Sequence, residues 1–125
     1  MRALRIVIAD DQRDNALTLA ALLRGEGHDT RIVHDGAHVL AVVQQYDPDA
    51  VLLDISMPSM NGWDVARQLR AHCGFARPMI IGVSGVYTKG ADRILGEMSG
   101  INAMLGKPYS IDSLLALLAP LSANP

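Results

Sequence analysis

The sequence predicts an α/β fold in which five parallel strands form one sheet covered by helices on both faces. Short apolar segments alternate with amphipathic helical segments along the 125 residues, and the connections between them are short. Most of the apolar segments are followed directly by an acidic, hydroxyl or basic residue. Parallel strands joined by right-handed helical crossovers give a doubly wound sheet of this kind.

Each predicted strand is a short apolar segment that ends at a polar residue or a turn. Residues 50–53 are continuously apolar, as expected for a central strand covered on both faces, and Asp54 follows them. The first segment carries Arg5 and leads directly into two aspartates, so it is typical of a strand and not of a signal peptide. The other predicted strands are residues 4–9, 30–33, 79–83 and 103–105.

The predicted helices lie between the strands and show apolar residues at helical spacing. Gly25 and Gly27 favour the end of the first helix, and Pro48 favours the end of the second. Ser110 is the expected cap of the last, leucine-rich helix. The first four predicted helices are residues 13–25, residues 37–46, a segment through Val65, Ala66 and Leu69, and residues 91–98.

Composition limits the class of protein. Half of the residues are apolar and 19% are charged, so we expect a single folded domain over residues 1–125. The net charge is −2, and the absence of a basic run argues against direct binding of nucleic acid or a membrane surface. With Cys73 as the single cysteine, an internal disulfide is excluded, and no segment approaches the roughly 18 apolar residues of a membrane span. We therefore expect a cytoplasmic protein.

The polar residues that follow the strands are the main indication of function. The first strand leads to Asp10 and Asp11, the third to Asp54, the fourth to Ser84 and the fifth to Lys107. Ligands of open α/β sheets bind beyond the carboxyl ends of the strands. We therefore expect three carboxylates, one hydroxyl and one ammonium group at the same edge.

Three carboxylates packed together repel one another unless a cation lies among them. Carboxylate, carbonyl and water oxygens suit Mg²⁺. A carboxylate is also able to attack phosphorus and form an aspartyl-phosphate. The set therefore predicts Mg²⁺-dependent phosphoryl transfer without a general base, in which Lys107 offsets the charge and Ser84 donates a hydrogen bond.

Each of these residues also has an ordinary structural interpretation. Asp10 or Asp11 alone fits a helix cap, and Asp54 alone fits a turn. Ser84 alone fits a loop, and Lys107 alone fits a solvated surface residue. The combination favours a site, because suitable residues end four of the five predicted strands.

The same residues carry a resemblance to a known family. They are Asp10-Asp11, Asp54 with the following Met57-Pro58-Ser59-Met60-Asn61-Gly62, Ser84-Gly85 and Lys107-Pro108. In this order they resemble the signature of bacterial response-regulator receiver domains of two-component systems, in particular stand-alone, chemotaxis-like receivers. The resemblance covers residues 4–121. It implies a flavodoxin-like (βα)5 fold with strand order 2-1-3-4-5.

The resemblance implies a role for each residue of the site. Asp54 would be the phosphoacceptor, taking its phosphoryl group from a histidine kinase or a histidine phosphotransfer protein. Mg²⁺ would be bound directly by Asp11, Asp54 and the backbone carbonyl of Ser56, with Asp10 acting through water.

The resemblance also implies roles outside the metal site. Ser84 and Lys107 would contact the phosphoryl oxygens, the Lys107–Pro108 peptide would be cis, and Pro58 and Gly62 would shape the loop after Asp54. Such a domain is not an enzyme that acts on external substrates. Its chemistry is limited to phosphorylation of Asp54 and autodephosphorylation.

One position departs from the family pattern. Receivers commonly carry Tyr or Phe three residues before the conserved lysine, whereas this chain has Met104. Methionine is flexible and fills gaps, but it has no ring or hydroxyl. We expect phosphorylation to be retained, and whether Met104 supports a switch like that of the aromatic residue stays open. Similar replacements are familiar in receivers attached to hybrid kinases, so the resemblance suggests a phosphorelay or a kinase-linked context.

Three other functions are alternatives to that of a phosphorylated receiver. A phosphatase with an aspartate nucleophile needs a second carboxylate two residues later, where this chain has Ser56. A flavodoxin-type redox carrier needs a phosphate loop, whereas Asp10 and Asp11 would repel a flavin phosphate. A receiver that has lost phosphorylation and acts as a docking module is the remaining alternative.

We expect the output of the domain to act through another protein, because we recognise no DNA-binding or enzymatic domain in this sequence. We expect signalling through protein–protein contacts, with a weak homodimer as one option. The face expected for it comprises residues 91–98, residues 103–105 and the last helix. The sequence leaves open the kinase, the target, the pathway and the phosphoryl lifetime.

Overall fold

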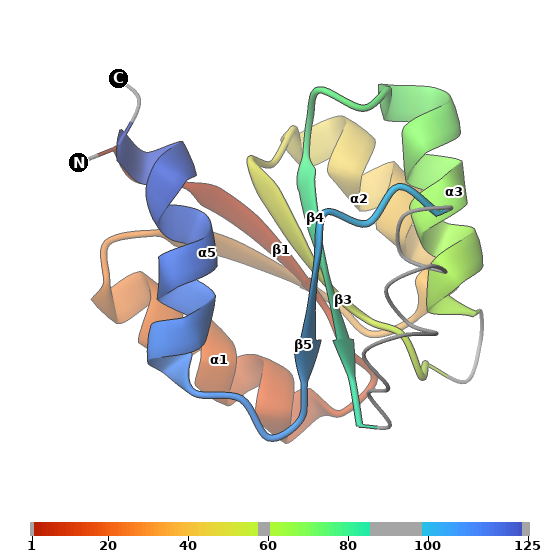
Figure 1. The fold of residues 1–125 in the computed structure, drawn as a ribbon. Coiled ribbons are helices and arrows are strands. Elements are labelled where there is room, and N and C mark those ends of the chain that lie inside the picture. Colours follow the sequence, from red (N-terminus) through yellow and green to blue (C-terminus); the bar gives the residue numbers. More distant parts are fainter. Residues whose placement is uncertain (1, 58–60, 86–98, 124–125) are drawn as a thin grey trace.

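A five-stranded parallel sheet forms the centre of the protein in the computed structural model, which describes residues 2–57, 61–85 and 99–123 (Figure 1). The order of the strands is β2-β1-β3-β4-β5, as predicted. In chain order the elements are β1 (Arg5–Ala9), α1 (Arg13–Gly25), β2 (Asp29–Val33), a 3₁₀ turn (Gly36–His38), α2 (Val39–Tyr46), β3 (Ala50–Asp54), α3 (Gly62–Cys73), β4 (Met79–Ser84), β5 (Ala103–Gly106) and α5 (Ile111–Ala123).

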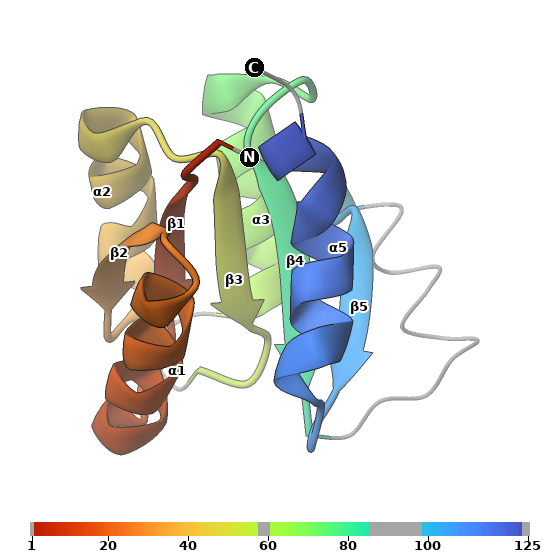
Figure 2. The same ribbon diagram turned by 90° about the vertical axis from the view of Figure 1, so that its left-hand side faces the viewer.

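Two apolar cores lie on opposite faces of the sheet. Helices α1 and α5 cover one face, and α2 and α3 cover the other (Figures 1 and 2). Because side chains alternate along a strand, Leu52 of β3 packs toward α1 and α5, whereas Val51 and Leu53 pack toward α2 and α3. All five residues of β3 are buried, which agrees with the continuously apolar sequence of this central strand.

The predicted elements agree with the structure within one or two residues, with one difference of kind. The segment expected as one helix over residues 37–46 is a 3₁₀ turn followed by α2. The carboxylate of Asp35 accepts a hydrogen bond from the amide of His38 at 3.0 Å, which caps the amino end of the turn, and α2 follows directly at Val39. The helix expected over residues 91–98 lies outside the described residues.

The parallel sheet has two distinct edges. All strands run in the same direction, so their carboxyl ends meet at the edge toward which the arrowheads point in Figure 2. We call this the carboxyl edge and the opposite one the amino edge. The chain termini lie at the amino edge (Figure 2). In the part of the chain that the structure describes, no helix has the length and apolar character needed to cross a membrane.

Candidate functional site

Asp54 is the central residue of the carboxyl edge. It is the last residue of β3, and only 5% of it is exposed. Its Oδ1 accepts a hydrogen bond from the amide of Ser56 at 2.9 Å, and its Oδ2 lies 3.3 Å from Nζ of Lys107. The strand and these two contacts fix the direction of the carboxylate.

Two further carboxylates lie beside Asp54. Asp10 and Asp11 follow β1, the neighbouring strand, and carboxylate oxygens of all three residues lie within 4.8 Å of one another. Asp10 also accepts a hydrogen bond from the amide of Gln12 at 2.9 Å. The sequence-based expectation that these carboxylates meet at one edge therefore agrees with the geometry.

The three carboxylates disfavour one another's charge. Burial raises the pKa of Asp10, and the nearby Asp54 and Asp11 carboxylates raise this pKa further. The hydrogen bond from Gln12 and the charge of Lys107 act in the opposite direction, but the net shift is upward. Among these charged groups, one ammonium faces three carboxylates, so the cluster favours a cation.

Lys107 and Ser84 come from the two strands that follow β3 in the sheet. Lys107 directly follows β5, is half-buried and forms an ion pair with Asp54. Ser84 is the last residue of β4 and is 7% exposed, and its carbonyl accepts a hydrogen bond from the amide of Lys107 at 2.8 Å. The Lys107–Pro108 peptide is cis, as expected, and Arg77–Pro78 is a second cis peptide that was not anticipated.

The loop after Asp54 is held by a close backbone approach. A Cβ atom on Gly62 would lie 2.6 Å from Cα of Ile55 and 3.2 Å from the carbonyl oxygen of Asp54. Gly62 also donates its amide to the carbonyl of Ile55 at 3.2 Å. A side chain at residue 62 would therefore displace the loop that carries the acceptor. Pro58, the other expected loop-shaping residue, lies outside the described residues.

Met104 packs over a glycine of the neighbouring strand. It pairs with Gly82 of β4, and a Cβ atom on Gly82 would lie 2.5 Å from Sδ of Met104 and 3.2 Å from Cδ1 of Ile55. The thioether and the Ile55 side chain therefore fill the space above Gly82. At the position where the family resemblance predicts an aromatic ring, this chain has a half-buried methionine that packs against the core.

A groove adjoins the site between α1 and the segment that joins β5 to α5. Its volume is about 520 Å³, and Asp10 and Lys107 form its end nearest Asp54. Leu19 and Leu22 of α1 line one wall and Tyr109 lines the other. Sequence reasoning did not link Tyr109 to the site. Burial raises the pKa of its hydroxyl, and the charges of Asp10 and Asp54 raise it further.

The fold and the site define a class. The protein is a doubly wound α/β domain whose parallel sheet presents an acidic cluster and one lysine at its carboxyl edge. Residues 6–119 match the sequence model of the family described as "Response regulator receiver domain". The chain belongs to this family, whose members are signalling domains of two-component systems that interact with histidine kinases and downstream targets.

Curated relatives are response regulators of mycobacteria. The DNA-binding response regulator MtrA of Mycobacterium leprae is 40% identical over 112 residues, which cover 90% of this chain and 48% of that protein. The transcriptional regulatory protein TcrA of Mycobacterium tuberculosis is 36% identical over 118 residues, which cover 94% of this chain and 46% of TcrA. The chain therefore spans about half the length of the curated relatives it matches.

Solved receiver domains share the fold over almost their whole length. The BeF3-activated receiver domain of Klebsiella pneumoniae RstA superposes with a TM-score of 0.85 at 25% identity, covering 96% of this chain and 99% of that one. The receiver domain of the sensor histidine kinase PA1611 of Pseudomonas aeruginosa has a TM-score of 0.84 at 26% identity, covering 98% and 99%. That structure is described with a magnesium ion coordinated in its active-site cleft.

Proposed function

We propose that residues 1–125 act as a single receiver domain in which Asp54 accepts a phosphoryl group from a phosphohistidine on a histidine kinase or phosphotransfer protein. The observation that carries this proposal is the environment of the Asp54 carboxylate. It is buried at the end of a central strand, paired with Lys107 at 3.3 Å, and bordered by the carboxylates of Asp10 and Asp11.

The donor set fits Mg²⁺. Three carboxylates whose oxygens come within 4.8 Å of one another offer hard oxygen ligands, and their mutual repulsion favours a divalent cation. We assign direct contacts to Asp11, Asp54 and the backbone carbonyl of Ser56, and a contact through water to Asp10. When bound, the cation offsets negative charge on the phosphoryl oxygens. The magnesium ion of the similar PA1611 receiver supports this assignment.

The phosphoryl transfer needs no base in this chain, because an ionised carboxylate carries no proton. One oxygen of Asp54 bonds to phosphorus while the bond between phosphorus and the imidazole nitrogen of the donor breaks, and that nitrogen keeps the electron pair. Lys107 lies on the Oδ2 side of Asp54 and stabilises charge on the transferred group. Ser84, at the end of β4, donates a hydrogen bond to a phosphoryl oxygen.

The same site allows water to hydrolyse the aspartyl-phosphate, so the domain returns to its starting state by autodephosphorylation. Turnover of external phosphoesters is not part of this proposal, because an aspartate-based phosphatase uses a carboxylate as general acid two residues after the nucleophile. Ser56 occupies that position, and its amide is already bonded to Asp54 at 2.9 Å.

The groove beside α1 is the surface best suited to the phosphodonor. It opens at Asp10 and Lys107, so a partner that fills it reaches the acceptor. Leu22 of α1 lines the groove and is 47% exposed, and Leu19 lies beside it, so the groove offers apolar surface to an apolar face of another protein. A helix that presents a phosphohistidine beside apolar residues meets both requirements.

Intact-mass measurement after incubation with acetyl phosphate and Mg²⁺ tests the proposal. The wild-type chain should gain the mass of one phosphoryl group, and Asp54→Asn should gain none. Asp47→Asn is the matched control, because Asp47 is 68% exposed at the amino edge and should not affect labelling. Chelation of Mg²⁺ should prevent the gain in wild type.

Two results would contradict the assignment. Continued labelling of Asp54→Asn at the wild-type level would exclude Asp54 as the acceptor. No labelling of the wild type, together with no metal-dependent spectral change on addition of beryllofluoride, would instead favour a docking module that has lost phosphorylation. Lys107→Ala should keep Mg²⁺ binding and lose most of the labelling, and a wild-type rate in this variant would exclude a role for the lysine.

A further inference from the structure

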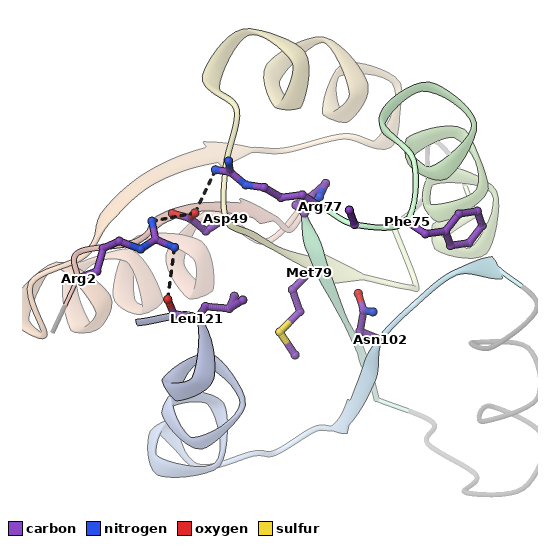
Figure 3. A pocket seen from close by; sticks show the side chains of 9 residues that line it. Arg2, Asp49, Phe75, Arg77, Met79, Asn102 and Leu121 are labelled. Carbon is purple, nitrogen blue, oxygen red and sulfur yellow. Dashed lines mark hydrogen bonds and ion pairs between the residues drawn. The ribbon is translucent and has the colours of Figure 1, made fainter. Parts of the chain in front are cut away.

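The pocket at the amino edge and the groove at the carboxyl edge differ in the hydrogen-bond donors that they offer. Figure 3 shows the amino-edge pocket, of about 550 Å³, where Arg2 and Arg77 form the charged wall. Both guanidinium groups are already paired with Asp49, at 3.1 and 3.0 Å, and Arg77 is also paired with Asp47 at 3.7 Å. These charged groups therefore hold segments of the chain together. The groove of about 520 Å³ beside Asp10 presents a different donor, the hydroxyl of Tyr109.

Tyr109 lies in the segment between β5 and α5 and lines the groove opposite α1. Its ring is half-buried and packs against the core beneath α1 and α5, which limits the positions that the hydroxyl is able to take. The hydroxyl makes no hydrogen bond with any residue that the structure describes. It is therefore available to a molecule that enters the groove.

The hydroxyl of Tyr109 belongs to the end of the groove nearest the phosphoacceptor. Burial raises its pKa, and the charges of Asp10 and Asp54 raise this pKa further, so the hydroxyl lies within the field of both carboxylates. It therefore keeps its proton at neutral pH and acts as a hydrogen-bond donor. Thr18, the other hydroxyl residue of the lining, is exposed and lies within α1.

The nitrogen-bearing side chains of the groove are engaged within the chain. Nζ of Lys107 lies 3.3 Å from Oδ2 of Asp54, so its charge acts on the side of the acceptor. Nδ2 of Asn15 donates a hydrogen bond to the side chain of Gln12. Among the lining residues that the structure describes, Tyr109 is therefore the donor side chain that is both unpaired and close to the acidic cluster.

Phosphoryl transfer from a phosphohistidine creates a stronger acceptor on the side of the phosphodonor. During an in-line transfer, the Asp54 oxygen and the leaving group lie on opposite sides of phosphorus. As the bond between phosphorus and one imidazole nitrogen breaks, the ring takes up the electron pair, and its second nitrogen becomes a stronger hydrogen-bond acceptor. A hydrogen bond to this second nitrogen therefore stabilises the transition state more than the ground state.

We propose that Tyr109 is a further residue of the phosphotransfer site, and that its hydroxyl donates a hydrogen bond to the second ring nitrogen of the leaving imidazole. The hydroxyl keeps its proton. The Asp54 oxygen bonds to phosphorus, the bond between phosphorus and nitrogen breaks, the imidazole retains the electron pair, and it takes a proton from solvent after it leaves. Leu19 and Leu22 on the opposite wall contact the apolar surroundings of the phosphohistidine. This role of Tyr109 rests on the proposed phosphorylation of Asp54.

Two small phosphodonors that differ in their leaving groups test this role. Acetyl phosphate releases acetate, whose carbonyl oxygen gains charge as the bond to phosphorus breaks and accepts a hydrogen bond, as the second imidazole nitrogen does. Phosphoramidate releases ammonia, which has no second acceptor atom. The rate of labelling of Asp54 is measured for each phosphodonor by intact mass, with Mg²⁺ at neutral pH.

Removal of the hydroxyl should affect the two phosphodonors differently. Tyr109→Phe should slow labelling by acetyl phosphate about tenfold and leave labelling by phosphoramidate within about twofold of wild type. Because the hydroxyl has no partner in the described chain, its removal should not lower stability, and urea denaturation checks this. Tyr46→Phe is the matched control, because it removes a hydroxyl that donates to Asp29 outside the groove, and it should change neither rate.

Three outcomes would overturn the role of Tyr109 alone. Equal rates of wild type and Tyr109→Phe with acetyl phosphate would leave the hydroxyl as a hydrated group of the groove. Equal losses with both phosphodonors would place its effect at Asp54 or at the metal, and the same loss in Tyr46→Phe would show that the effect does not depend on the groove. Labelling of wild type by phosphoramidate would support the proposed function in each of these cases. No labelling of wild type by either phosphodonor would overturn both proposals.

Discussion

The carboxylates at the two edges of the sheet differ in charge compensation. At the amino edge, the buried carboxylate of Asp49 is compensated by Arg2, Arg77 and the amide of Arg5. At the carboxyl edge, Asp10, Asp11 and Asp54 face one another, and Lys107 is their partner of opposite charge.

The edges also differ in what holds them together. Side chains join the segments of the amino edge: Arg70 donates hydrogen bonds to the carbonyls of Gly74, Pro78 and Gly100 as well as to Asn102. At the carboxyl edge, backbone contacts such as Ile55 to Val83 and the close approach of Gly62 hold the loops in place.

The difference in charge compensation between the two edges has opposite consequences for the stability of the fold. Compensated charges contribute to the stability of the fold. Uncompensated carboxylates reduce it unless a cation binds to them or one of them reacts with a transferred group. We therefore expect neutralisation of a carboxylate to reduce stability at the amino edge and to increase it at the carboxyl edge. Four substitutions test this expectation and the contacts that hold the strands and loops, in order of decreasing effect.

The largest effect is expected for Gly62→Ala at the carboxyl edge. Its Cβ atom would meet Cα of Ile55 at 2.6 Å, and a backbone atom cannot move aside without shifting the loop after Asp54. We expect a loss of about 3 kcal/mol in the free energy of unfolding, measured by urea denaturation. Gly25→Ala is the control, because a Cβ atom there meets nothing within 4 Å and alanine favours a helix. Equal effects of the two substitutions would contradict the backbone role of Gly62.

Asp49→Asn should reduce the free energy of unfolding by about 2 kcal/mol, because it removes charge-assisted hydrogen bonds to two arginines. The pKa of Asp49 lies below its ordinary value of 3.8, so the stabilisation is complete above that pH and is lost as the pH falls through the lowered pKa. The difference between wild type and variant should therefore shrink below about pH 4. A constant difference across that range would mean that the charge of Asp49 is not the cause.

Gly82→Ala should cost about 1–2 kcal/mol, because the new methyl group would meet the sulfur of Met104 at 2.5 Å. The double variant Gly82→Ala/Met104→Ala should recover part of this loss, and a double-mutant cycle measures the coupling. A neutral effect of Gly82→Ala would show that Met104 turns outward easily, and it would restore this position as a candidate for a moving switch.

The smallest effect has the opposite sign. Asp10→Asn should increase the free energy of unfolding without Mg²⁺ by about 0.5–1 kcal/mol at neutral pH, a figure reduced for the partial exposure of the side chain. The pKa of Asp10 is raised, so its ionisation above that pKa opposes folding, and asparagine removes the charge while keeping an acceptor for Gln12. Added Mg²⁺ should stabilise wild type more than the variant. A less stable variant without metal would contradict the comparison of the two edges.

The sequence predicted the carboxyl edge well, for a physical reason. Asp10, Asp54, Ser84 and Lys107 each lie at or directly after the end of a strand, so the order of the strands is enough to bring them together. The bounds of most elements were confirmed as well, because apolar periodicity depends on local sequence. The order of the strands, which the family resemblance implied, was also confirmed.

The amino edge could not be predicted in the same way. Arg70 bonds to Gly100 and Asn102, which lie 30 and 32 residues away, and a helical arginine with such partners looks in the sequence like a solvated one. The packing of Met104 also depends on tertiary structure, because it follows from the register that places Gly82 opposite. Local patterns carry no information about either contact.

The hydrogen bonds between residues 2 and 122 have a consequence for protein engineering. The amide of Arg2 donates to the carbonyl of Ser122 at 2.8 Å, and Oγ of Ser122 donates to the carbonyl of Arg2 at 2.5 Å. Because these two residues are neighbours, the domain is suited to insertion into a surface loop of a host protein or to circular permutation. Both joints would lie at the amino edge, so an inserted copy would keep the acidic cluster exposed on the side away from its host.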